Sequence, residues 1–159
     1  MRSALPLGVA VLLAALAAAQ DQPAIPAKRP NPFLRGACLS LHDEDPERDY
    51  SAEIAAVDSR LNASHLAGVF HLWQPRVDSK VPARGDKTPS DEALRRILKA
   101  ARARGLATVL MPIVLLEESK QGEWRGKLRP PDEKAWLEAY RALVVAYARF
   151  AREEGCAHF

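Results

Sequence analysis

Two tryptophans with polar neighbours are the side chains best suited to bind a ligand. Trp73 and Gln74 end one apolar segment, whereas Trp124 and Arg125 are adjacent in a polar stretch that follows another. An indole ring stacks on the apolar C–H face of a sugar ring, and a guanidinium group donates hydrogen bonds to sugar hydroxyls. We therefore treat these four residues as candidates for carbohydrate binding. The alternatives are loop packing by each tryptophan and a loop salt bridge for Arg125.

His42 and Asp78 also follow apolar segments and are candidates for contact with the same ligand. His71 lies inside an apolar segment, which favours a core or lining role, and we assign none to His65 or His158. The histidines show no H-x-H or H-x-x-x-H spacing, so we expect no metal site. The sequence contains no phosphate-binding loop and no serine nucleophile elbow, and we expect no cofactor.

Acidic side chains follow two of the apolar segments. The first group comprises Asp43, Glu44, Asp45, Glu47 and Asp49, and the second comprises Glu117 and Glu118. A solvated loop that leads into a helix and caps it explains the first group, because carboxylates are stabilised at helix N-termini. Surface charge on a loop explains the second group. We therefore assign no catalytic role to these carboxylates.

The composition is that of a globular protein without a strong charge bias. The 159 residues are 48% hydrophobic and 27% charged, with a net charge of +3. Basic and acidic residues alternate along the chain without a long basic block, which argues against nucleic acid as a partner. The cysteines Cys38 and Cys156 are far apart in the sequence, and we expect both to be free buried thiols.

The N-terminus has the pattern of a secretory signal peptide. One arginine precedes a short apolar run and three small residues, which predicts a signal over 1–19 that is cleaved before Gln20. The alternative is an uncleaved membrane anchor, although the run is short for a span. We expect export to the periplasm or the extracellular space, with no stable membrane insertion after cleavage. Residues 20–32 are proline-rich and predict an extended linker before a domain over 33–159.

Apolar periodicity predicts three strand–helix units in the remaining domain. The expected strands are 33–41, 64–73 and 106–116, and the expected helices are 49–61, 88–105 and 132–155. Thr88 can cap the second helix, and Gly105 and Gly155 can end the second and third helices. The last helix should bury one face, comprising Trp136, Leu137, Tyr140, Leu143, Val144, Tyr147 and Phe150. The residues after Gly155 should begin a fourth strand.

Repeated strand–helix units with apolar strands predict an α/β fold with a parallel sheet. A doubly wound sheet and a (β/α)₈ barrel both fit this order. No G-x-G-x-x-G motif follows the first strand, which makes a dinucleotide-binding sheet less attractive without excluding other open sheets. Long loops after the strands are expected to carry any site.

Residues 33–159 resemble the N-terminal half of glycoside hydrolase family 113 and its barrel relatives. The resemblance rests on "TPSDEALRRILKAARARGL", the strand ending "LMPIV", the loop with "GEWRGKL" and the helix that ends in "EEG". It implies a (β/α)₈ TIM-barrel fold, of which the chain holds the first three βα units and the start of strand four. The implied activity is retaining hydrolysis of a β-linked polysaccharide such as β-mannan.

The resemblance assigns no catalytic residue to this chain. The family's acid/base glutamate lies at the end of strand four and its nucleophile on a later strand, so neither matches a residue up to Phe159. We therefore interpret the chain as a truncated enzyme that is inactive and poorly folded alone. The alternative is a non-catalytic exported module that binds glycans or self-associates.

Overall fold

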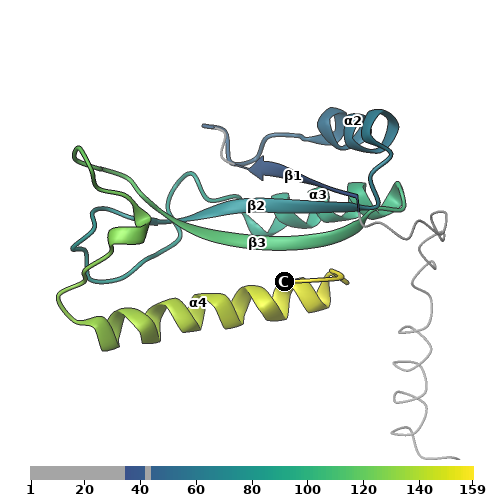
Figure 1. The fold of residues 1–159 in the computed structure, drawn as a ribbon. Helices are drawn as coiled ribbons and strands as arrows, with labels where there is room; N and C mark the ends of the chain where they lie inside the picture. Colours follow the sequence, from purple (N-terminus) through teal and green to yellow (C-terminus); the bar gives the residue numbers. More distant parts are fainter. Residues whose placement is uncertain (1–34, 42–43) are drawn as a thin grey trace, which may run out of the picture.

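The computed structural model describes residues 35–41 and 44–159 (Figure 1). The predicted signal peptide, the linker and His42 lie outside the described residues. In chain order the elements are β1 (Gly36–Leu41), α2 (Ser51–Leu61), β2 (His65–Gln74), α3 (Asp91–Ala103), β3 (Ala107–Leu116), the short 3₁₀ helix η1 (Arg125–Lys127) and α4 (Glu133–Glu153). The predicted alternation of strands and helices is confirmed.

The three strands form one parallel sheet in the order β1-β2-β3. The register aligns Gly36 with His65 and His65 with Ala107 at the amino ends of the strands. The last residues of the chain extend this sheet, because Val109 and His158 form a parallel bridge. The N–H of Ala157 also donates to the Thr108 carbonyl at 2.8 Å. The expected start of a fourth parallel strand beside β3 is therefore confirmed.

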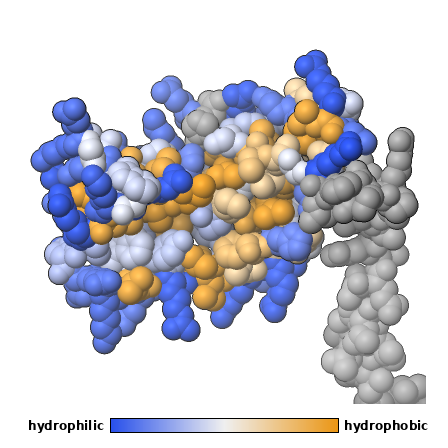
Figure 2. Space-filling view, viewed as in Figure 1, coloured by the Kyte–Doolittle hydropathy of each residue, from blue (hydrophilic) through white to orange (hydrophobic). Residues whose placement is uncertain are grey.

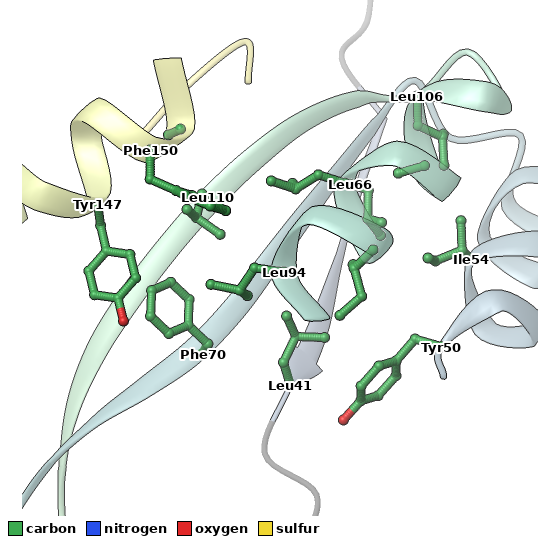
Figure 3. Close-up of a cluster of buried hydrophobic side chains, with 14 of the residues drawn as sticks. Leu41, Tyr50, Ile54, Leu66, Phe70, Leu94, Leu106, Leu110, Tyr147 and Phe150 are labelled. Carbon is green, nitrogen blue, oxygen red and sulfur yellow. The ribbon is translucent and has the colours of Figure 1, made fainter. Parts of the chain in front are cut away.

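One face of the sheet packs against the helices. Alternate residues of a strand point to opposite faces, and Leu66, Phe70 and Leu110 point toward the helices (Figure 3). They join one buried cluster with Leu94 of α3 and Phe150 of α4. Burying such side chains stabilises each by about 1.5–3 kcal/mol relative to exposure. This side of the sheet is the hydrophobic core; we call it the helix face.

The opposite face of the sheet, which we call the inner face, is more open. It carries Cys38, which is exposed, and Met111, whose exposed fraction is 42%. Hydrophobic side chains form a band across the middle of the molecule in Figure 2. The prediction that Cys38 is buried is wrong, because β1 is an edge strand and Cys38 points to the inner face. Cys156 is half-buried, and both thiols are free.

The start of α3 differs from the prediction. Ser90 rather than Thr88 caps the helix, since its hydroxyl accepts a hydrogen bond from the Ala93 N–H at 3.0 Å. The Thr88 hydroxyl instead donates to the His71 carbonyl of β2 at 2.8 Å. Gly105 follows α3 with a φ of 70° and Gly155 follows α4 with a φ of 67°. Both adopt the left-handed conformation that favours glycine after a helix, as predicted.

Helix α4 buries less of its apolar face than predicted. Tyr147 and Phe150 are buried, whereas Trp136 is half-buried and Leu137 is 53% exposed. The prediction for Leu137 is wrong because each residue turns a helix by about 100°, which rotates Leu137 away from the side that Trp136 presents to β2. No helix in the described part of the chain is long and apolar enough to span a bilayer.

Candidate functional site

A pocket of about 340 Å³ lies where β2 and β3 end at their carboxyl edges. It is lined by Trp73, Gly85, Asp86, Lys87 and Glu117. Parallel strands bring their carboxyl ends to one edge of the sheet, where α/β proteins place ligands. The pairing between the strands continues past the end of β3, because the Glu117 N–H donates to the Gln74 carbonyl at 2.9 Å. Strand pairing therefore fixes two walls of the pocket, and the loop after β2 supplies the third.

The loop after β2 folds back onto the strand beside Trp73. Trp73 and Ala83 exchange two backbone hydrogen bonds of 2.8 and 2.9 Å in an antiparallel bridge. The Trp73 ring lies edge-on to the His71 ring, with 5.8 Å between their centroids. Both side chains belong to the inner face, two residues apart. Trp73 therefore forms an aromatic wall of the pocket, and its backbone is paired with β3 on one side and with Ala83 on the other.

The indole nitrogen of Trp73 is a buried hydrogen-bond donor. Trp73 Nε1 is buried and has no hydrogen-bond partner within residues 35–41 and 44–159. A buried N–H usually finds an acceptor, because an unpaired one costs about 1–3 kcal/mol. Around the same pocket, Asp86 and Glu117 present carboxylates and Lys87 presents an ammonium group. Such a pocket suits a neutral ligand with many hydroxyl groups.

Gln74 lies away from this pocket, contrary to its predicted role in substrate binding. Its side chain has no exposed surface and points to the helix face, because it follows Trp73 on the pleated strand. Gln74 Oε1 accepts from Trp136 Nε1 at 2.8 Å, and Nε2 donates to the Arg76 carbonyl at 2.7 Å. Gln74 therefore ties α4 and the loop after β2 to the strand.

Trp124 and Arg125 lie in the segment between β3 and α4. This segment lies at the same end of the sheet as the loop after β2 (Figure 1). Trp124 is 58% exposed, and its indole lies over Gly126. This loop contacts the loop after β2, because the Arg129 N–H donates to the Val77 carbonyl at 2.8 Å. The two residues do not line the Trp73 pocket. They form a second, more open part of the same edge.

Asp78 pairs with Arg76 in the loop after β2. Arg76 Nε and Asp78 Oδ1 are 3.1 Å apart, and this hydrogen bond lowers the pKa of the Asp78 carboxyl below its ordinary value. Asp78 is therefore an ionised acceptor at neutral pH, although it does not line the Trp73 pocket. His42, the remaining candidate, lies outside the described residues.

Two of the carboxylates after β1, Glu47 and Asp49, bond to residues at the starts of helices. Hydrogen bonds from Ser90 and then Arg96 lower the pKa of Glu47, and hydrogen bonds from Ser51 lower the pKa of Asp49. This agrees with the prediction of a loop that leads into a helix. Within the part of the chain that the structure describes, no three His, Cys, Asp or Glu side chains form a group able to hold a metal ion.

Sequence reasoning missed the part of the pocket that the loop after β2 provides. Gly85, Asp86 and Lys87 carry no motif and lie in a polar loop outside the predicted strands and helices. Among them only Gly85 could have indicated the pocket, since a glycine in a polar loop marks a turn or a close approach of the backbone to another group. The pairing of Trp73 with Ala83 brings this turn to the pocket.

Most of the described chain matches the sequence model of a known protein family. Residues 47–159 match the family model described as Glycoside Hydrolase Family 113. The chain belongs to glycoside hydrolase family 113. The resemblance inferred from the sequence is confirmed. A comparison with curated protein sequences finds no match.

The chain also resembles solved structures from the same family. Two structures of a β-1,4-mannanase of family 113, one of them a complex, match with a TM-score of 0.69 and 19% identity over 78% of this chain and 43% of theirs. A β-mannanase of the family from Alicyclobacillus acidocaldarius, in complex with ManMIm, matches with a TM-score of 0.67 and 21% identity over 82% of this chain and 44% of its own. The chain spans less than half the length of these proteins. The fold is therefore of the barrel type predicted, represented here by its first three strands.

Proposed function

We propose that this chain forms one side of the substrate cleft of an exported, retaining glycoside hydrolase that acts on β-mannan. Membership of the family supports glycoside hydrolysis in general. The substrate is inferred from structural neighbours that are described as β-mannanases. Export is inferred from the pattern of residues 1–19, which also implies a mature protein beginning at Gln20.

The observation that carries this proposal is the pocket beside Trp73. An indole at the carboxyl end of a barrel strand, with carboxylates and a lysine around it, fits a sugar ring by stacking and by hydrogen bonds. The exposed Trp124 and Arg125 at the same edge provide further contacts for a longer saccharide. In this proposal Asp78, on the loop after β2, adds an ionised hydrogen-bond acceptor.

Retaining hydrolysis needs two carboxyl groups about 5–5.5 Å apart on either side of the scissile bond. We propose that both are supplied by residues other than those of this chain, since no carboxylate here matches the family's glutamates. The chain spans 43% of the first neighbours, which leaves room for them elsewhere. This chain is then expected to bind saccharide and to leave it intact.

The test is calorimetric titration of the purified chain with β-1,4-mannohexaose, together with an assay of reducing-sugar release. We expect saturable binding, and we expect Trp73→Ala to weaken it by roughly tenfold, which corresponds to about 1.4 kcal/mol. Leu137→Ala, which alters an exposed side chain of α4 away from the pocket, is the control and should bind normally. Saccharide release by the wild-type chain would overturn the claim of inactivity, and absence of binding would overturn the assigned site.

The second candidate function is a non-catalytic module that self-associates. The open inner face favours it, because Met111 is 42% exposed on a sheet face that carries apolar residues. Sedimentation equilibrium distinguishes the two candidates. A dimer or larger oligomer that does not bind mannohexaose supports the module, whereas a monomer that binds the saccharide supports the cleft.

A further inference from the structure

Gly85 lies against the Trp73 indole so closely that no side chain fits between them. A Cβ atom added at Gly85 would lie 2.7 Å from Trp73 Cδ1, 3.0 Å from Cγ and 3.1 Å from Cβ. The backbone of Gly85 is not in the left-handed region, so its conformation alone does not require glycine. The requirement comes from the space that the indole occupies.

The contact cannot be relieved by rotating the indole alone. Trp73 Cβ is fixed to the strand and does not move when the ring turns, so a larger residue at 85 must displace the ring, the loop or both. Gly126 provides a contrast. The three atoms nearest to an added Cβ there are far atoms of the Trp124 ring, and Trp124 is 58% exposed, so its side chain has solvent to turn into. Of these two glycine–indole contacts, only the one at Gly85 fixes its ring.

Hydrogen bonds hold Gly85 in this place. Its N–H donates to the Thr88 hydroxyl at 3.0 Å, and its carbonyl accepts from the Thr88 N–H at 2.9 Å. The Thr88 hydroxyl in turn donates to the His71 carbonyl of β2 at 2.8 Å, and Thr88 is buried. At the other end of the turn, Ala83 is paired with Trp73 itself. The segment 83–88 is therefore attached to β2 on both sides of the indole.

We propose that the segment 83–88 is a clamp that fixes the Trp73 indole as the wall of the pocket, and that Gly85 is its positioning residue. The clamp sets the plane on which a sugar ring stacks. This assignment of a ligand rests on the proposed function, whereas the clamp itself is a property of the unliganded chain.

The clamp is tested without ligand by ¹⁹F NMR of the chain labelled with 5-fluorotryptophan. The three tryptophans should give three resonances, and Trp73→Phe assigns the one of interest. We expect Gly85→Ala to shift or broaden the Trp73 resonance alone. Gly68→Ala is the matched control in β2, because its added Cβ meets Leu41 at 3.6 Å and Val109 at 3.9 Å, which are ordinary contacts. An unchanged Trp73 resonance in Gly85→Ala overturns the clamp.

Binding is then measured on the same samples with β-1,4-mannohexaose. We expect the wild-type Trp73 resonance to shift on titration, Gly68→Ala to bind as the wild type does, and Gly85→Ala to bind at least tenfold more weakly. Equal affinity of Gly85→Ala despite a displaced ring would overturn the positioning role. A wild-type chain that does not bind would overturn the proposed function, and the ligand-free result on the clamp would still stand.

Thr88→Val provides a second variant in case Gly85→Ala does not fold. Valine keeps the shape of threonine but removes the hydroxyl that links the Gly85 N–H to the His71 carbonyl. We expect the Trp73 resonance to broaden and the affinity to fall severalfold, less than in Gly85→Ala. Wild-type line width and affinity in a folded Thr88→Val chain would show that the clamp does not depend on this link, and would overturn that part of the inference.

Discussion

The two faces of the sheet differ in what their side chains do. On the helix face, Leu66, Phe70 and Leu110 are almost without exposed surface and pack against three helices. On the inner face, Cys38 of β1 and Met111 of β3 are exposed, and β2 between these two strands ends at Trp73, which lines the pocket. The helix face therefore provides most of the stability, whereas the inner face carries the surfaces that are open to a ligand or to another protein segment.

The largest expected effect is on stability, from truncating a residue of the helix face. Phe70 has no exposed surface, and its ring centroid lies 4.7 Å from that of Tyr147. Phe70→Ala should lower the free energy of unfolding by about 3–5 kcal/mol, because it leaves a cavity. Met111→Ala on the inner face is the matched variant and should cost less than about 1 kcal/mol. Denaturant unfolding followed by circular dichroism measures both, and equal losses would contradict the comparison.

A smaller effect is expected from Tyr147, whose hydroxyl is buried without a hydrogen-bond partner among the described residues. Burial raises its pKa above the ordinary 10.0, although the charge of Arg84 opposes this. The raised pKa means that the contribution of Tyr147 to stability is complete below pH 10 and is lost as pH rises through the folded-state value. Tyr147→Phe should unfold at neutral pH with the same free energy, or up to about 1 kcal/mol more.

The stability of Tyr147→Phe should fall less at alkaline pH than that of the wild type, because phenylalanine does not ionise. Unfolding free energies measured between pH 7 and 11 test this sign, and Tyr140→Phe, which changes a half-buried tyrosine on the same helix, is the control. Identical pH profiles for wild type and Tyr147→Phe would show that another group causes the alkaline decrease.

The smallest effect concerns reaction rates of the two thiols rather than stability. Cys38 is exposed on the inner face, whereas burial raises the pKa of the half-buried Cys156, opposed by the Thr108 hydrogen bond and Arg102. At pH 8 a disulfide reagent should therefore modify Cys38 faster, on the order of tenfold. Cys38→Ser and Cys156→Ser assign the two phases. Slow modification of Cys38 would show that its side of the sheet is covered in solution.

Local patterns along the chain were sufficient to predict the elements and their order. Strand and helix periods in the apolar residues predicted β2, β3, α3 and α4 to within a few residues, and glycines at 105 and 155 predicted the helix ends. The segments that resemble the family also predicted the barrel type, which the family match and the fold comparison confirm. These features depend on residues close in sequence, so the sequence alone determines them.

Features that depend on residues far apart in sequence were decided by the tertiary structure. Gln74 is polar and adjacent to Trp73, but the pleat of β2 turns its side chain into the core. There its oxygen accepts a hydrogen bond from the Trp136 indole of α4. Thr88 looks like a helix cap, but it is within reach of the His71 carbonyl on β2 and bonds there. The pocket itself joins two strand ends with a turn that pairs back onto Trp73. Its position depends on strand register and loop closure, which no local pattern encodes.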